Sequence, residues 1–158
     1  MPSIRLMALA SPGVETIWAL ATARARSLLL LRKLMWEAPA LSSGAMGYLF
    51  KPVKREQLID MLEGLEARME QRMRRVLVVE DDAQQAESIK LLLASRDVET
   101  LEAHSAAQCF DMLGRETFDC MVLDLNLPDM SGTDILARIK GSDGPVRRTP
   151  VVMLTTTD

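Results

Sequence analysis

The chain has 158 residues, 48% of them hydrophobic, and a net charge of −3, which suits one ordinary domain, or one domain and part of another. It contains no run of about 18 uninterrupted apolar residues, so a membrane span is not expected. Its two cysteines, Cys109 and Cys120, form neither a disulfide framework nor a metal-ligand spacing with the only histidine, His104, and we expect two core thiols in a reducing compartment.

Charge divides the chain into two parts. Residues 1–75 carry 12 Lys and Arg against 7 Asp and Glu, a net charge of +5, whereas residues 76–158 carry 7 against 15, a net charge of −8. This asymmetry indicates two segments of different origin or role. The second segment is not expected to bind nucleic acid, because an acidic surface repels phosphate.

The first 43 residues give the weakest structural signal. Ile4–Ala10 and Arg26–Leu31 could each form a strand, and Pro12, Gly13 and Pro39 interrupt any regular structure. We therefore treat 1–43 as a segment of uncertain organisation.

Residues 44–75 predict a strand followed by a helix. Residues 44–50 read as a loop entering a strand, which Lys51–Pro52 ends. A helix opens at Glu56, and its apolar residues recur at helical spacing: Leu58, Leu62, Leu65, Met69 and Met73. We expect this helix to run to Arg74 and to join the next strand, at Val76, with almost no linker.

From residue 76 onward, strands and helices alternate. Short apolar runs predict strands at Val76–Val79, Val98–Ala103, Phe118–Leu123 and Thr149–Thr155. Helical spacing predicts a helix through Ala86–Leu93, a second over Ala106–Leu113 closed by Gly114, and a third from an N-cap at Ser131 to Gly141. This alternation predicts an α/β fold: a doubly wound parallel sheet with right-handed crossovers and helices on both faces.

Polar residues follow these strands at their carboxyl ends, where ligands gather in such sheets. Glu80 and Asp81 follow the first strand of this segment, Asp124 follows the third, and Thr155 ends the fourth. Clustered carboxylates at strand ends indicate a hard-cation site, with one carboxylate available as a nucleophile.

The motifs around these residues resemble the receiver domain of two-component response regulators, which has a flavodoxin-like fold. The stretch 75–82 (RVLVVEDD) resembles that family's first strand and acidic pair, 121–132 (MVLDLNLPDMSG) its phospho-acceptor strand and following loop, and 150–155 its fourth strand with the switch threonine. The resemblance covers 76–158. It implies a cytoplasmic signalling phosphoprotein rather than an enzyme, with a histidine kinase or histidine phosphotransfer protein as its partner.

The resemblance also assigns a role to each matching residue. Asp124 would accept the phosphoryl group, and the hydroxyl of Thr155 would act as the switch. The ligands of a Mg²⁺ ion would be Glu80, Asp81, Asp124 and the backbone carbonyl of Asn126. Carboxylates this close repel one another, and a divalent cation removes that penalty. Asp82 has no matching role and is interpreted as the exposed start of the next loop.

The segment 76–158 lacks the lysine of the family, because it stops after the fourth strand. Upstream, 44–53 (GAMGYLFKPV) and the helix after it resemble the missing end: Lys51 matches the family lysine and Tyr48 the switch aromatic. Three architectures are open. In the first, which we favour, the chain is a piece of a tandem-receiver protein or hybrid sensor kinase, and 1–43 is a remnant of a preceding receiver.

In the second architecture, 44–75 supplies the fifth strand and last helix to the receiver core, 76–158, of the same chain, as in a permuted domain. In the third, two chains exchange this segment in a swapped homodimer. Either form of completion is expected to be needed for solubility, because a sheet without its fifth strand exposes an apolar edge.

Two functions follow from these features. The first is a phosphorelay switch, with Mg²⁺-dependent transfer of a phosphoryl group from phosphohistidine to Asp124. The alternative, suggested by the broken order of elements, is a non-catalytic pseudo-receiver or interaction fragment. An aspartyl-phosphate hydrolase is disfavoured, because Asn126 stands where such enzymes carry a second acid. The cognate kinase, the signal and the output are not specified by the sequence.

Overall fold

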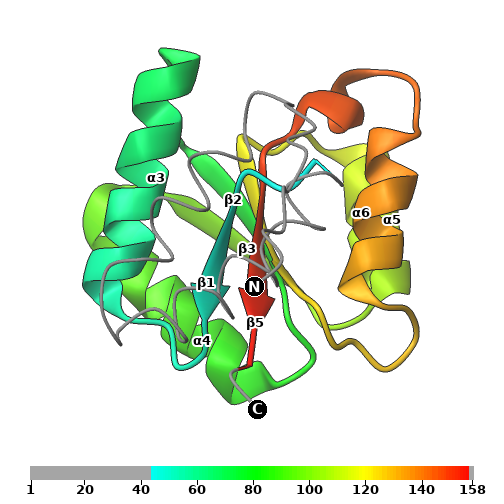
Figure 1. The fold of residues 1–158 in the computed structure, drawn as a ribbon, viewed down its shortest axis with the longest axis horizontal. Helices are drawn as coiled ribbons and strands as arrows, with labels where there is room; N and C mark the ends of the chain where they lie inside the picture. Colours follow the sequence, from blue (N-terminus) through cyan, green and yellow to red (C-terminus); the bar gives the residue numbers. More distant parts are fainter. Residues whose placement is uncertain (1–43, 157–158) are drawn as a thin grey trace, which may run out of the picture. The chain divides into compact units, whose positions relative to one another are not determined.

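A parallel sheet of five short strands, in the order β1-β5-β4-β2-β3, runs through the middle of the described residues (Figure 1). The computed structural model describes residues 44–156, so the strands predicted at 4–10 and 26–31 lie outside the described residues. The strands are β1 (Gly47–Phe50), β2 (Arg75–Val79), β3 (Glu99–Ala103), β4 (Cys120–Asp124) and β5 (Val151–Thr155). The helices are α3 (Arg55–Met69), α4 (Ala83–Leu93), α5 (Ala106–Arg115) and α6 (Gly132–Lys140), with 3₁₀ turns η1 (Ala94–Arg96) and η2 (Pro145–Arg148).

The apolar strands bury both faces of the sheet, as their continuous apolar runs predict. On one face, α3 and α4 pack through Leu58, Leu62 and Ile89 against the sheet. On the other, α5 and α6 cover a second apolar cluster (Figure 1). The predicted α/β, flavodoxin-like, doubly wound fold is therefore confirmed. Cys109 and Cys120 are fully buried, and burial raises the pKa of each thiol to about 12, as expected for inert core residues.

The edge strand β1 comes from the segment upstream of β2. It pairs in parallel with β5 of the same chain, from Gly47 opposite Val152 to Phe50 opposite Thr155. The ladder continues one residue further, because the N–H of Lys51 donates to the carbonyl of Thr155 at 2.8 Å. In this single-chain arrangement, β1 and α3, which both precede β2, pack with the strands and helices that follow it.

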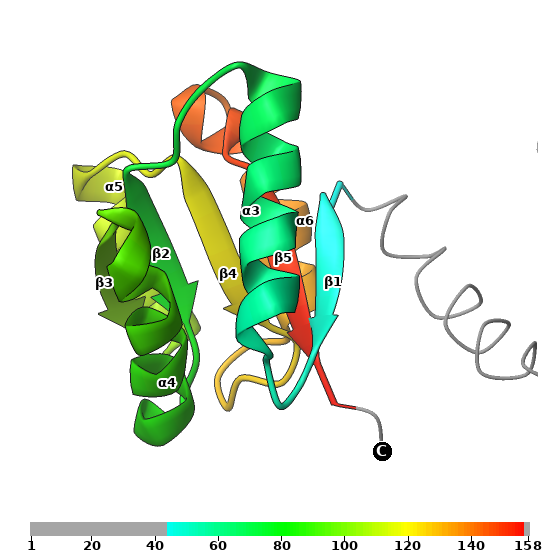
Figure 2. The same cartoon turned by 90° about the vertical axis from the view of Figure 1, so that its left-hand side faces the viewer.

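The connection from α3 to β2 differs from the prediction of a helix running to Arg74. The helix ends at Met69, and Glu70 takes a left-handed conformation with φ of 52°. The turn is then anchored by side chains: a carboxylate oxygen of Glu66 accepts from the N–H of Met73 at 2.8 Å, and Asp119 accepts from the N–H of Arg74 at 2.9 Å. Figure 2 shows this turn passing from the end of α3 to the start of β2.

Several predicted boundaries shift by one or two residues; the strands predicted from Val98 and Thr149, for example, begin at Glu99 and Val151. The strand predicted from Phe118 begins at Cys120, although Phe118 is itself buried at 7% exposure. The helix expected to close at Gly114 includes that glycine and ends at Arg115. None of these shifts moves a candidate site residue, because they lie at the ends remote from the carboxyl edge of the sheet.

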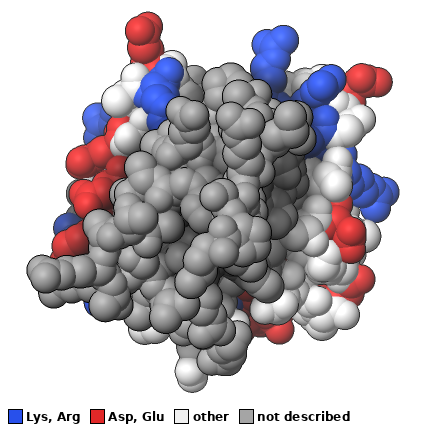
Figure 3. All heavy atoms as spheres, viewed as in Figure 1, with Lys and Arg blue, Asp and Glu red and all other residues white. Residues whose placement is uncertain are grey.

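Basic side chains gather at the amino end of β5, over η2 and α6, where Figure 3 shows blue atoms at the upper right. The exposed members are Arg138, Arg147 and Arg148. Lys140 is partly buried beside them and donates to the carbonyls of Arg147 and Thr149 at 3.1 and 2.9 Å. These cations stand at the opposite end of the strands from Glu80 and Asp124, so they do not neutralise the acidic edge.

Candidate functional site

Four strands deliver polar side chains to one edge of the sheet. Glu80 and Asp81 follow β2, Asp124 ends β4, Thr155 ends β5, and Lys51 follows β1. Because all the strands are parallel, their carboxyl ends meet at this edge. Glu80, Asp81 and Asp124 each place a carboxylate oxygen there, and these oxygens lie within 4.8 Å of one another.

Lys51 neutralises part of this acidic cluster. Its Nζ lies 2.5 Å from a carboxylate oxygen of Glu80 and 3.0 Å from one of Asp124. The side chains of Glu80 and Asp124 are only 1% and 4% exposed, so the pairing takes place away from solvent. Burial opposes the charge on Lys51, but the bonds to the two carboxylates outweigh it and raise the pKa of the lysine. Burial likewise raises the pKa of Glu80, against the opposing effect of Lys51.

The remaining oxygens suit a divalent cation. Asp124 Oδ1 is buried and has no hydrogen-bond partner among the described residues. An unsatisfied buried carboxylate oxygen is costly, and a hard cation with oxygen ligands satisfies it. Asp81 is exposed, which leaves the cluster open to water on that side. The residues therefore fit Mg²⁺, which retains several waters and uses one or two carboxylates.

The other predicted site residues lie around this edge. Thr155 is 2% exposed, and its hydroxyl donates to the carbonyl of Thr156 at 3.3 Å. Tyr48 is 9% exposed and belongs to the apolar cluster under α5 and α6. Asn126 is exposed in the loop after β4, where it forms an isolated bridge with Ser131. The switch roles of Thr155 and Tyr48, and the metal role of the Asn126 carbonyl, stay predictions.

Asp82 has a structural role that the sequence interpretation missed. It is exposed, as expected, but its carboxylate caps α4 by accepting from the N–H groups of Gln84 and Gln85 at 2.9 and 3.1 Å. The bond from Gln85 is the main cause of the lowered pKa of Asp82. An aspartate directly before a helical run is a standard N-cap signal, so the sequence did contain the clue.

The loop that follows Asp124 is fixed by close backbone contacts. The N–H of Gly132 donates to the carbonyl of Leu125 at 2.8 Å, and a Cβ at position 132 would overlap the main-chain oxygen of Asp124. Asp129 ties the same loop to α5, since its two oxygens accept from the N–H groups of Ala106 and Ala107 at 2.9 and 3.1 Å. These contacts hold the loop against its neighbours and so fix the direction of Asp124.

Comparison with known proteins accounts for this arrangement. The family model described as "Response regulator receiver domain" matches residues 76–158, which is more than half of the chain. The chain belongs to the response regulator receiver family. The predicted resemblance is therefore confirmed for 76–158, while the matched region leaves out Tyr48 and Lys51 of the upstream segment.

Individual relatives match the same half of the chain. The cell cycle response regulator CtrA of Brucella ovis is 36% identical over 80 residues, which are 51% of this chain and 33% of that protein. The chain thus spans about a third of the length of such relatives. The signal receiver domain of a signal transduction histidine kinase from Syntrophus aciditrophicus is 27% identical with a TM-score of 0.51, over 54% of this chain and 64% of that one.

A Chloroflexus aurantiacus protein described as a "putative response regulator" has the same TM-score of 0.51, over 54% of this chain and 70% of that one. At 24% sequence identity, this similarity supports the fold alone. Receiver domains are signalling modules of two-component systems and are not enzymes in the ordinary sense. They interact with histidine kinases or phosphotransfer proteins, and they bind Mg²⁺ at an acidic pocket. Among residues 44–156, no helix has the length and apolar character needed to cross a membrane.

Proposed function

We propose that this receiver accepts a phosphoryl group from a phosphohistidine on Asp124. The observation that carries the proposal is the buried, unpartnered Oδ1 of Asp124 beside Lys51 and two further carboxylates. In the transfer, a carboxylate oxygen of Asp124 bonds to phosphorus while the bond from phosphorus to the histidine nitrogen breaks. The histidine nitrogen keeps the electron pair of that bond, and the product is an acyl phosphate.

Each neighbouring residue has a defined task in this step. Glu80, Asp81, Asp124 and the carbonyl of Asn126 would hold Mg²⁺, which supplies charge neutralisation when bound. Lys51 already stands 3.0 Å from Asp124, so it can pair with an oxygen of the incoming phosphoryl group without a long movement. Thr155 would then donate its hydroxyl to the phosphoryl group. Tyr48, on the α5–α6 side of β1, would change position in response to the movement of Thr155.

A small phosphoryl donor tests the proposal directly. Incubation with acetyl phosphate and Mg²⁺ should add the mass of one phosphoryl group, and Asp124→Asn should abolish that gain. Asp143→Asn, which changes an exposed aspartate between α6 and η2, away from the carboxyl ends of the strands, serves as the matched control and should behave as the wild type. A wild-type protein that gains no mass, or a gain that persists in Asp124→Asn, contradicts the assignment.

We further propose that Lys51 and Asp124 act within one chain. The anchored turn between α3 and β2 supports this, because Met73 is 1% exposed and the N–H groups on either side of Arg74 are held by side chains. Mixing Lys51→Met chains with Asp124→Asn chains discriminates the architectures. A swapped dimer would restore a complete site in mixed dimers and recover phosphorylation, whereas self-completed monomers would show no recovery.

A non-catalytic interaction module is the second candidate, favoured by the position of the lysine upstream of the acceptor. Titration with Mg²⁺ separates the two: a working site should bind the ion in the millimolar to sub-millimolar range, and an inert one should give no response. The parent protein, whether a tandem receiver or a hybrid kinase, and the cytoplasmic location are proposals that rest on the family alone.

A further inference from the structure

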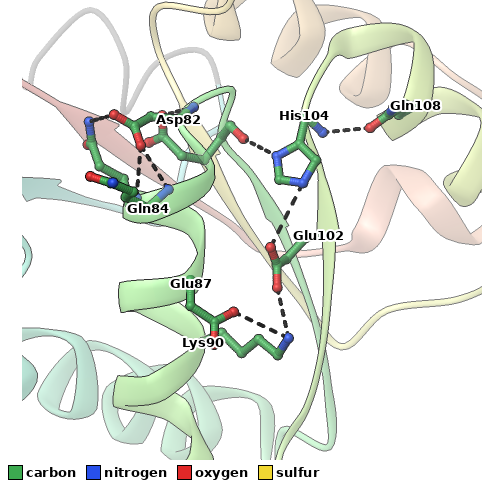
Figure 4. A network of polar contacts seen from close by, with 9 residues as sticks. Asp82, Gln84, Glu87, Lys90, Glu102, His104 and Gln108 are labelled. Carbon is green, nitrogen blue, oxygen red and sulfur yellow. Dashed lines mark hydrogen bonds and ion pairs between the residues drawn. The ribbon is translucent and has the colours of Figure 1, made fainter.

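We propose that His104 is a positioning residue for the acidic end of β2. This inference rests on the proposed function, since it concerns the same metal site. The Nδ1 atom of His104 lies 2.9 Å from the main-chain oxygen of Glu80, and Figure 4 shows the ring turned toward that carbonyl. A carbonyl oxygen can only accept, so Nδ1 carries the proton and donates it.

The bond from His104 to Glu80 lies where the ladder between β2 and β3 ends, and this position explains how it can orient Glu80. The ladder between β2 and β3 reaches Glu80, whose N–H donates to the carbonyl of Ala103 at 3.0 Å. In a parallel ladder that continued, the N–H of Ser105 would donate next to the Glu80 carbonyl. But β3 ends at Ala103, where the chain turns into α5. The imidazole of His104 takes the place of that next donor and extends the ladder by one bond.

The backbone that carries the ring is fixed on a further side, and a carboxylate lies near the ring at a distance too long for a hydrogen bond. The N–H of His104 donates to the side chain of Gln108 at 2.8 Å, which fixes the backbone that carries the ring. At the far nitrogen, Nε2 lies 3.9 Å from a carboxylate oxygen of Glu102, which in turn pairs with Lys90 at 3.0 Å. Figure 4 shows this chain of contacts passing from α4 through β3 to the end of β2.

Together these contacts immobilise Glu80 at both ends. Its carbonyl is held by His104, and its carboxylate is held by Lys51 and accepts weakly from the N–H of Asp82 at 3.3 Å. The carbonyl of Glu80 and the N–H of Asp81 belong to one planar peptide. The bond to His104 therefore sets the orientation of that peptide, and with it the direction in which Asp81 presents its carboxylate to a metal.

Three substitutions at one position test this. His104→Asn keeps a donor close to the place of Nδ1, His104→Gln moves the donor one bond further along, and His104→Ala removes it. We expect Mg²⁺ binding, measured by titration calorimetry, to weaken about three- to ten-fold in the Ala and Gln variants, the effect of one lost hydrogen bond. His104→Asn should bind Mg²⁺ like the wild type.

A second measurement needs no metal. In Mg²⁺-free protein, hydrogen exchange of the Glu80 amide, which donates to the Ala103 carbonyl beside this bond, should accelerate in His104→Ala and His104→Gln and stay unchanged in His104→Asn. Equal behaviour of all three variants and the wild type overturns the inference, as does an Asn variant that fails with the Ala variant. A third outcome separates this inference from the proposed function. If the exchange pattern holds but the wild type neither binds Mg²⁺ nor takes a phosphoryl group, the proposed function is wrong. His104 then has no positioning role at a metal site, and its bond to Glu80 is structural only.

Discussion

Replacing Lys51 by methionine isolates the electrostatic role of this residue. Methionine keeps much of the apolar stem but removes the cation that lies 2.5 Å from Glu80 and 3.0 Å from Asp124. Both carboxylates are almost fully buried, so they would face each other without compensation. One of them must then take up a proton, and the pKa of Glu80, already raised by burial, should rise further.

The magnitude follows from the burial of the pair. Removing one partner of a buried ion pair typically costs about 3–5 kcal/mol. Lys51 keeps 13% exposure and the cluster is open beside Asp81, so water can partly compensate, and we expect about 3 kcal/mol, the lower end of that range. A bound divalent cation should return part of this loss, because an ion at ten times its dissociation constant stabilises the folded state by about 1.4 kcal/mol.

Urea unfolding in EDTA and in Mg²⁺ measures both effects. Lys51→Met should be much less stable than the wild type in EDTA, and Mg²⁺ should stabilise it more than it stabilises the wild type, because the lysine no longer competes for the same oxygens. Lys54→Met is the matched control: it removes the same charge from an exposed side chain three residues later. If Lys51→Met loses no more stability in EDTA than Lys54→Met, the buried-pair reasoning is wrong.

Three further predictions address the frame around the site. Gly132→Ala should slow phosphorylation by acetyl phosphate, because its Cβ would overlap the main-chain oxygen of Asp124; an unchanged rate would show that this loop can move freely. Leu62→Ala, at a fully buried position of α3, should lower the free energy of unfolding by about 2–5 kcal/mol, whereas Leu91→Ala, 64% exposed, should have little effect in the same urea titration. The pKa of Asp129 is held below its ordinary 3.8 chiefly by the bond from the N–H of Ala106. The contribution of Asp129 to stability is therefore present above about pH 4 and is lost as the pH falls through the lowered pKa. When the pH is lowered from about 5 to about 3, the free energy of unfolding of Asp129→Asn should fall less than that of the wild type.

The sheet could be predicted because its strands carry their signal locally. Val76–Val79 and the run ending at Asp124 are short and continuously apolar, as buried parallel strands are, and the first is also rich in β-branched residues. The convergence of Glu80, Asp81 and Asp124 then follows from the parallel arrangement alone. These parts of the site needed no knowledge of contacts between distant residues.

Other features depend on contacts that periodicity does not contain. Met73 continues the apolar spacing of α3, so the sequence placed it in the helix; it is buried instead from a non-helical turn that Glu66 and Asp119 anchor. The sequence also left undecided which residues Lys51 contacts, because these contacts depend on which strand β1 pairs with. The contact of His104 with Glu80 depends on where β3 ends, and a lone histidine after a strand gives no sign of it.

The register of β1 explains why chain order matters so little to the site. Tyr48 belongs to the apolar cluster under α5 and α6, and Leu49 to the cluster under α3 and α4. A slip of one residue along β5 would exchange these faces. A slip of two would keep the faces but move Lys51 by about 6.6 Å, which removes its contacts with Glu80 and Asp124. Burial of the strand and formation of the site therefore demand the same register, whether the strand enters from upstream, from downstream or from another chain.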